Sequence, residues 1–343
     1  MSGGARYLLL AEGFLADVHH GKTARGVLLY GEQPTVCVLD STYPEPSFRG
    51  VPVVGSLAEA MTHGPTVALV GVAPTGGKLP PAFRAIVLDA IRAGLSIEAG
   101  MHEFLSDDPE LAAAARERSV ELRDLRRPPA DLSVPTGANL DHDATVVLTV
   151  GSDCAIGKMT MALELHREAL GRGRRSVFVP TGQTGIAIAG WGISVDAVVA
   201  DYVAGATERL VVEGVARGGD LLWIEGQGSL IHPFYSGVTL GLYHGSAPHL
   251  LVLCHKPPFE TIDGHPRYAL RSLPELVELH ERMSLPARQA RVCAVALNTS
   301  LLDEDEARSW IARAEAETGL VADDPVRFGA SRLVDAVLAA ERR

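Results

Sequence analysis

The sequence predicts an α/β protein with two domains, and three observations support this fold class. The chain has 343 residues, which is more than a single hydrophobic core comfortably holds. Apolar runs of strand length alternate with helical patterns along most of the sequence, which is typical of parallel sheets covered on both faces. A stretch with three prolines and no periodicity, residues 126–137, separates two such series. We therefore expect a boundary near residue 130, with domains of residues 1–130 and 131–343.

The first domain is predicted from its alternation of strands and helices. Its strand-like runs are Tyr7–Ala11, Thr35–Leu39 and Thr66–Val72. Helical patterns are expected near Leu57–Met61, Pro81–Ala93 and Asp108–Arg118. The turn at Val72–Gly77 lacks the G-x-G-x-x-G pattern, so it gives only weak support for dinucleotide binding.

The second domain is predicted to be doubly wound around a parallel sheet. Five strand-like runs are expected, at Thr145–Val150, Ser176–Pro180, Leu221–Ile224, His249–Cys254 and Val292–Leu297. Helices are expected at Lys158–Leu170, Thr207–Ala216, Leu273–Met283, Glu304–Glu317 and Ala330–Glu341. In such a sheet, ligands bind at the carboxyl ends of the strands. The loops that follow these strands are therefore the place to look for a site.

The loop after the first of these strands has the pattern of a phosphate-binding loop. A β-branched run leads into GSDCAIGKMT and then into an apolar helical pattern. In such loops, backbone N–H groups, a helix N-terminus and a lysine ammonium converge on a polyphosphate. The residues expected to bind a phosphate-bearing cofactor are Gly151, Ser152, Asp153, Cys154, Ala155, Ile156, Gly157, Lys158, Met159 and Thr160.

This loop departs from the usual G-x-x-x-x-G-K-[ST] pattern in two places. Ser152 occupies the first glycine position, and Gly151 just before it can supply the turn. Met159 replaces the hydroxyl that normally coordinates Mg²⁺, so Thr160 would have to take over that role or no metal is needed. The alternative is an ordinary glycine-rich turn between a strand and a helix. Phosphate binding is thus predicted more firmly than metal-dependent hydrolysis.

Other strand ends offer candidate catalytic and substrate-binding side chains. Glu225 ends a buried-looking strand and begins Glu-Gly-Gln-Gly, where a carboxylate could hold Mg²⁺ or act as a base; a capping role is the alternative. Asp201 and His232 are further candidates for acid–base chemistry. The candidates for substrate contacts are Thr181, Gln183, Thr184 and Gln227. Asn298 ends the last strand and could bind the edge of an adenine through its amide.

Composition excludes several classes of protein. The formal net charge of −11 argues against non-specific nucleic-acid binding, and the basic residues at 123–127 and 172–175 are expected to be solvated helix ends. No apolar run is long enough to cross a bilayer, and no secretory signal is evident, so we expect a cytoplasmic protein without a membrane partner. The four cysteines show no C-x-x-C spacing, and no zinc motif is present. A homodimer is the expectation for an enzyme of this size.

The second domain resembles the dethiobiotin-synthetase-like branch of P-loop proteins. The resemblance rests on GSDCAIGK, on EGQG after a strand and on Asn298 after the last strand. It implies that Lys158 binds nucleotide phosphates, that Glu225 binds Mg²⁺ and that Asn298 binds adenine.

The whole chain, about residues 6–335, resembles a narrower family, the D-glutamate N-acetyltransferase-like proteins. Its marks here are GKMT-x-A-LEL, VPTGQTG, VDAVVADYVAGA-x-E, IEGQGSL-x-HP and VLCHKP. The resemblance implies a Rossmann-like N-terminal domain followed by a P-loop domain. Many members have no known function, and one branch acetylates D-glutamate beside an enolase-superfamily racemase.

Three functions follow as hypotheses. The first is an amino-acid N-acetyltransferase that uses acetyl-CoA, whose ADP-like phosphates would occupy the loop, with Glu225, Asp201 or His232 as the base. The second is an ATP-dependent ligase or kinase-like enzyme with Mg²⁺ between Thr160 and Glu225. The third is a nucleotide-binding regulatory protein.

Overall fold

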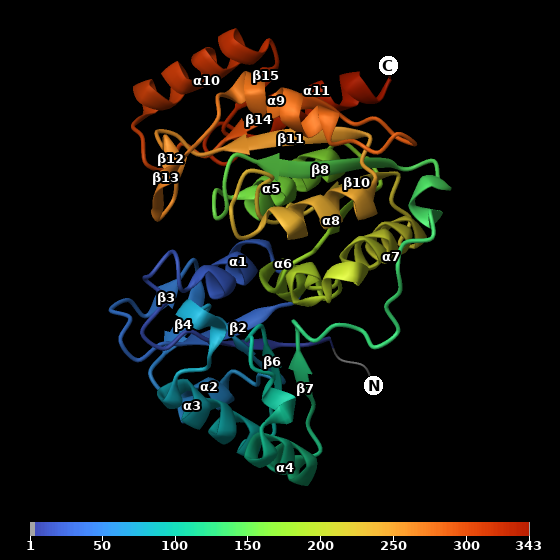
Figure 1. The fold of residues 1–343 in the computed structure, drawn as a ribbon. Helices are drawn as coiled ribbons and strands as arrows, with labels where there is room; N and C mark the ends of the chain where they lie inside the picture. The colour runs from blue at the N-terminus through green and yellow to red at the C-terminus, as the bar shows by residue number, and fades with distance from the viewer. Residues whose placement is uncertain (1–3, 343) are drawn as a thin grey trace. The chain divides into compact units, whose positions relative to one another are not determined.

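The computed structural model describes residues 4–342, which fold into two α/β units (Figure 1). The first unit contains the chain up to Pro128 and also Gly182–Ser194, and the second contains Pro129–Thr181 and the chain from Val195 onward. Residues 182–194 were expected in the second domain, whereas their contacts in the structure group them with the first unit. The predicted α/β class with parallel sheets is confirmed.

The first unit is built on a seven-stranded sheet with the order β3-β4-β2-β1-β5-β6-β7. Its neighbouring strands are parallel except for β3 and β4. The strands are β1 (Tyr7–Leu10), β2 (Thr35–Leu39), β3 (Ser47–Phe48), β4 (Val51–Val54), β5 (Val67–Val70), β6 (Ser96–Ala99) and β7 (Leu122–Asp124). The helices are α1 (Lys22–Tyr30), α2 (Leu57–Thr62), α3 (Pro81–Arg92), α4 (Pro109–Arg118) and α6 (Gln183–Ala189).

Helix α1 was not predicted, because its nine residues include Gly26 and only a short apolar run. The structure forms it nevertheless, since Thr23, Ala24, Gly26 and Val27 are buried in the unit. Helix α6 packs against it, and the hydroxyl oxygens of Thr23 and Thr184 lie 2.9 Å apart. Tertiary packing therefore overrides the weak helical propensity of this segment.

The second unit contains a six-stranded parallel sheet with the order β15-β14-β11-β8-β10-β9. The strands are β8 (Thr145–Gly151), β9 (Ser176–Val179), β10 (Leu221–Ile224), β11 (Leu250–His255), β14 (Arg291–Leu297) and β15 (Val321–Asp323), and a separate hairpin consists of β12 (Thr261–Ile262) and β13 (His265–Ala269). The helices are α5 (Lys158–Gly171), α7 (Val203–Ala216), α8 (Ser236–Ser246), α9 (Leu273–Arg282), α10 (Glu304–Thr318) and α11 (Ser331–Glu341).

The five predicted strands of this sheet are present, and β15 adds a sixth at the edge. Strand β8 lies between β10 and β11, and its residues from Val146 to Gly151 are buried. A central strand is covered on both faces and flanked on both sides, so the loop that follows it receives support from two neighbouring strand ends.

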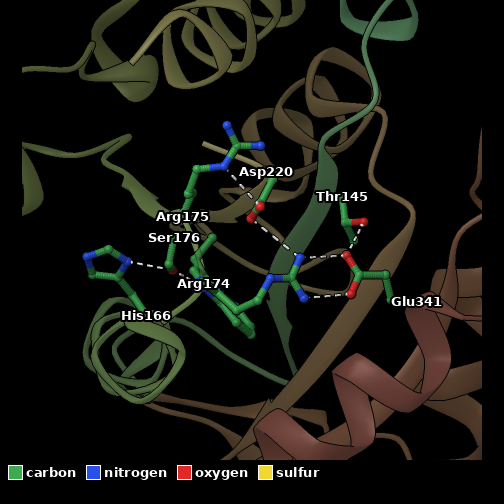
Figure 2. Close-up of polar contacts among 8 residues, drawn as sticks. Thr145, His166, Arg174, Arg175, Ser176, Asp220 and Glu341 are labelled. Atoms are coloured by element: carbon green, nitrogen blue, oxygen red, sulfur yellow. Dashed lines mark hydrogen bonds and ion pairs between the residues drawn. The ribbon is translucent and has the colours of Figure 1, made fainter. Parts of the chain in front are cut away.

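A polar network holds the opposite, amino-terminal edge of this sheet (Figure 2). The guanidinium of Arg174 donates to both carboxylate oxygens of Glu341, at 2.8 and 2.9 Å, and Thr145 donates to the same carboxylate at 2.8 Å. Arg174 and Arg175 both contact Asp220. Arg174 therefore ties α11 to the starts of the strands, whereas Arg175 stays largely exposed, as expected from the sequence.

No helix within residues 4–342 has the length and apolar character needed to cross a membrane.

Candidate functional site

The loop Ser152–Gly157 connects β8 to α5 and has a strained, tightly folded backbone. Ala155 and Gly157 have positive φ angles of 52° and 103°. A Cβ on Gly157 would also lie 3.3 Å from the Asn298 amide nitrogen, and one on Gly151 would lie 2.7 Å from the Ile156 side chain. The positive φ of Gly157 requires glycine there, and a side chain at Gly151 would displace the end of the Ile156 side chain, which favours a built loop over an ordinary turn.

Lys158 is buried at the first position of α5 and folds back over this loop. Its Nζ donates a hydrogen bond to the Asp153 carbonyl oxygen at 2.6 Å, and the residue is 6% exposed. Burial lowers the pKa of the ammonium, although Cys154, Cys254, Asp153 and Glu225 favour its charged form. A buried cation at a helix N-terminus, where the macrodipole disfavours it, is stabilised when an anion binds beside it.

Side chains from neighbouring strand ends hold the loop in place. The Ser152 hydroxyl lies 2.9 Å from His255 Nδ1, and Ser229 donates to the Ser152 carbonyl at 3.2 Å. Burial lowers the pKa of His255 to about 4, so the imidazole is neutral at pH 7. These contacts fix the loop before any ligand arrives.

Asn298 also supports the loop. Its amide Nδ2 donates to the Ile156 carbonyl at 2.9 Å, and its Oδ1 accepts from the Ser300 N–H at 3.2 Å. From the sequence, Asn298 was expected to bind the edge of an adenine. In the structure, one of its two N–H groups and its oxygen are used within the protein, so Asn298 has a positioning role toward the loop.

Glu225 follows β10 and lies beside the loop, as predicted. A Cβ on Gly226 would lie 1.7 Å from the Thr149 carbonyl and 3.1 Å from the Lys158 side chain, so only glycine permits this close approach. Glu225 is buried, and its Oε2 accepts from the Thr181 N–H at 2.9 Å. The carboxylate is thus held close to the base of the phosphate loop.

Thr181 and Gln227 complete a network around Glu225. The Thr181 hydroxyl donates to the Glu225 carbonyl at 2.6 Å, and the Gln227 amide donates to that hydroxyl at 3.2 Å. These three residues, which come from the ends of β9 and β10, are therefore brought together.

His232 is a buried neighbour of the loop, and its hydrogen bonds define its tautomer. The Phe234 N–H donates to His232 Nδ1 at 3.2 Å, so Nδ1 carries no proton. Burial lowers the pKa of the imidazole, and the neutral ring therefore carries its proton on Nε2, which lies 3.9 Å from Asp153 Oδ1. His232 presents a hydrogen-bond donor to the loop, and it is unsuited to act as a base through Nε2.

The same tautomer bears on metal binding. The ligating atoms of Asp153, Cys154 and His232 lie within 4.8 Å of one another, and these residue types suit a zinc ion. Ligation through Nε2 would require the imidazole proton to move to Nδ1, which already accepts from the Phe234 N–H, and would require the Cys154 thiol, whose pKa burial raises to about 11, to lose its proton. In the structure both Asp153 carboxylate oxygens accept backbone N–H groups, from Cys154 and Asp263.

The remaining predicted residues come from both units. Asp201 is exposed on the short 3₁₀ helix Ala200–Tyr202. Gln183 and Thr184 lie on α6 in the first unit, where Gln183 accepts a hydrogen bond from Arg126 at 3.2 Å. Met159 and Thr160 follow Lys158 in α5, and both are half-buried.

Some residues of the site were not among the predicted candidates. Asp263, on the β12–β13 hairpin, donates its N–H to the Asp153 carboxylate at 2.8 Å. Phe234, Tyr235 and Tyr268 are large exposed aromatic side chains close to the same hairpin and to His232. For Phe234 and Tyr235, the one signal in the sequence was that two aromatic residues follow closely after His232.

These features define the class of the protein: an α/β protein with a P-loop in its second unit. A P-loop domain of unknown function, DUF1611_C, matches residues 133–334, and the Rossmann-like domain DUF1611_N matches residues 40–128. The chain belongs to the DUF1611 family.

Curated relatives and a solved structure agree with this membership. A D-glutamate N-acetyltransferase from Tritonibacter scottomollicae is 39% identical over 83% of this chain and 84% of its own length. A second protein of that name, from a Pseudoalteromonas species, is 33% identical over 81% and 83% of the two chains. The crystal structure of a DUF1611 family protein from Anabaena variabilis is 40% identical, with a TM-score of 0.91 over 98% of this chain and all of that one.

Proposed function

We propose that this protein is an amino-acid N-acetyltransferase that transfers the acetyl group of acetyl-CoA to the amine of D-glutamate or a similar amino acid. The observation that carries the proposal is the similarity to two proteins named D-glutamate N-acetyltransferase over more than four fifths of the chain. The proposed place is the cytoplasm, and the proposed assembly is a homodimer.

The P-loop supports this proposal because acetyl-CoA carries phosphates of the kind that such loops bind. Lys158 and the loop N–H groups would neutralise and orient them. Met159 stands where a Mg²⁺-binding hydroxyl is usual, which suits a loop that holds phosphates without cleaving them.

The chemistry requires a base, a donor and a leaving thiol. The neutral amine attacks the thioester carbonyl, the C–N bond forms, the C–S bond breaks, and the proton lost by the amine ends on the CoA sulfur. Glu225 is the proposed base, because its carboxylate is fixed by the Thr181 N–H and interacts electrostatically with Lys158. The His232 Nε2–H would donate to the oxygen of the tetrahedral intermediate, so its proposed role is that of a donor instead of a base.

One observation favours a second candidate. A carboxylate beside the P-loop lysine is also the arrangement that phosphoryl transfer requires, with Mg²⁺ between Glu225 and Thr160. The protein would then be an ATP-dependent ligase acting on a small carboxylate.

The two candidates differ in the product that they release. The purified protein is incubated with a panel of D- and L-amino acids, with acetyl-CoA in one arm and ATP and Mg²⁺ in the other. We expect free thiol to appear with an acidic D-amino acid in the absence of ATP. Release of ADP without any thiol would overturn the acetyltransferase proposal in favour of the ligase.

A further inference from the structure

Five aromatic side chains form a continuous group next to the phosphate loop, which we call the ring cluster. They come from the loop between β10 and α8 and from the β12–β13 hairpin. His232 stacks on Tyr235 with ring centroids 4.7 Å apart, and Phe234 meets His265 edge-on at 4.9 Å. His265 in turn contacts Tyr268 at 6.3 Å. The members are His232, Phe234, Tyr235, His265 and Tyr268.

The ring cluster is attached to the phosphate loop through Asp153. One carboxylate oxygen of Asp153 accepts from the Asp263 N–H at 2.8 Å, which fixes the tip of the hairpin. The other accepts from the Cys154 N–H at 2.6 Å and lies 3.9 Å from His232 Nε2. The rings are therefore held at a fixed position beside whatever the loop binds.

The outer part of the ring cluster is open to solvent. Phe234 is 62% exposed, Tyr235 is 51% exposed and Tyr268 is 46% exposed. His232 lies beneath these rings and is 4% exposed. Because burial lowers the pKa of its imidazole, His232 adds no charge to the ring cluster at neutral pH. Neighbouring aromatic side chains that are exposed to solvent form an apolar surface on which a planar ligand can stack.

We propose that the exposed rings of the ring cluster, Phe234, Tyr235 and Tyr268, form a stacking site for the adenine ring of the phosphate-bearing ligand. The buried His232 keeps its Nε2–H toward the phosphate loop. A phosphate held by the loop places the attached nucleoside within reach of the loop's immediate neighbours. Exposed aromatic rings bind bases through their faces without regard to the hydrogen-bonding edge. Asn298 is the alternative adenine contact, but its amide N–H donates to the Ile156 carbonyl and its amide oxygen accepts from the Ser300 N–H. For acetyl-CoA as the ligand, this inference rests on the proposed function.

The test measures binding alone and therefore does not depend on catalysis. Calorimetry on the full chain would compare ADP, CoA and pyrophosphate, and fluorescence would follow the etheno analogue of ADP. We expect Phe234→Ala to weaken ADP and CoA about tenfold while changing pyrophosphate affinity less than twofold. Stacking on the rings should also quench the etheno fluorescence, and the quenching should be reduced in the variant.

Leu301→Ala is the matched control. Leu301 is 58% exposed, and it lies after β14, close in sequence to Asn298. We expect it to leave the affinity for all three ligands unchanged. A selective loss of ADP affinity in Leu301→Ala or Asn298→Ala, with none in Phe234→Ala, would place the base beside β14 and overturn the proposal.

Two further outcomes would also overturn it. An equal loss of ADP and pyrophosphate in Phe234→Ala would mean that the ring only supports the loop. A change of oligomeric state in that variant, with unchanged ADP affinity, would mean that a second copy covers the ring cluster. Tyr268→Ala, at the far end of the cluster, serves if Phe234→Ala fails to fold. Ring-dependent ADP binding without any thiol release would leave this inference standing and remove the proposed function.

Discussion

The chain contains two loops in which a strand leads to Gly-Lys at the start of a helix, and only one of them is built to bind phosphate. Gly21-Lys22-Thr23 begins α1 in the first unit, and Gly157-Lys158-Met159 begins α5 in the second. A threonine follows Lys22, as the usual pattern requires, but the spacing of the glycines before it is too long; the second loop has the usual spacing, counted from Ser152, and a methionine after its lysine. In the structure, Lys22 is exposed, whereas Lys158 is buried and folded over its loop.

The difference lies in what fills each loop. Seven residues separate Gly13 from Gly21, and within them the Asp17 carboxylate accepts from the N–H groups of His19 and His20 at 2.8 and 3.0 Å. The loop's own anion thus occupies two of its N–H donors, whereas in the second loop the Asp153 carboxylate occupies one, that of Cys154. A Cβ on Gly21 would lie 2.2 Å from the Phe14 carbonyl, so that glycine serves backbone packing. A phosphate site needs unoccupied N–H groups and a buried cation, and the letters of a motif do not guarantee either.

The largest expected effect separates the two lysines. Lys158→Ala should weaken pyrophosphate and CoA binding at least about 100-fold, because it removes the buried cation of the loop. Lys22→Ala is the matched control and should change both affinities less than about twofold. Calorimetry measures both. Similar losses in the two variants would show that the comparison between the loops is wrong.

Substitutions of His232 test its proposed role as a hydrogen-bond donor at the second loop. His232→Leu should lower kcat/KM about 100-fold, the usual cost of losing one donor to an oxyanion. His232→Gln, which can keep an N–H near the position of Nε2, should retain most of the activity. Nitrogen NMR of the imidazole should show Nδ1 without a proton between pH 6 and 8. A protonated Nδ1, or equal inactivity of both variants, would restore a role as base.

Acid should act on the two loops in different pH ranges. Burial lowers the pKa of His255 from 6.5 to about 4, so its contribution to folding is complete above pH 6.5 and is lost as the pH falls toward 4. At pH 5 the resulting loss in the free energy of unfolding is roughly 2 kcal/mol. Backbone and side-chain hydrogen bonds lower the pKa of Asp17 from 3.8 to about 2, so the first loop loses its stabilisation only below pH 3.8.

Hydrogen exchange near Ser152 and near His19, followed from pH 7 to about 2, measures these two transitions. We expect His255→Asn to flatten the dependence near Ser152 alone. Parallel loss of protection in both loops above pH 4 would contradict the prediction.

The smallest expected effect concerns the support of each loop. Asn298→Ala leaves the Ile156 carbonyl without its donor and should lower the free energy of unfolding by about 1 kcal/mol. Pyrophosphate affinity should fall about fivefold, because the loop becomes less ordered. Asp17→Ala disturbs the support of the first loop and should not affect pyrophosphate binding. Denaturant unfolding and calorimetry measure the two effects, and an unchanged affinity in Asn298→Ala would remove its positioning role.

Much of the site was predicted from local sequence. The run from Thr145 to Lys158 indicated a strand, a loop and a helix, and Glu225 was expected near it because parallel strands end at one edge of the sheet. Asp201 was proposed on chain position alone, and the structure leaves it exposed on a short turn. The aromatic residues of the ring cluster were missed because they come from two loops far apart in sequence.

The alternation of strands and helices and the P-loop between β8 and α5 were predictable from the amino-acid sequence because each depends on spacing within a short segment, and the place of Glu225 followed from the common edge at which parallel strands end. The folded protein was needed to show that Asn298 holds the loop, that His232 is a donor, and that residues 182–194 group with the first unit. Those properties depend on which atoms meet across strands and loops distant in the chain. Burial then sets the protonation of the groups that meet there.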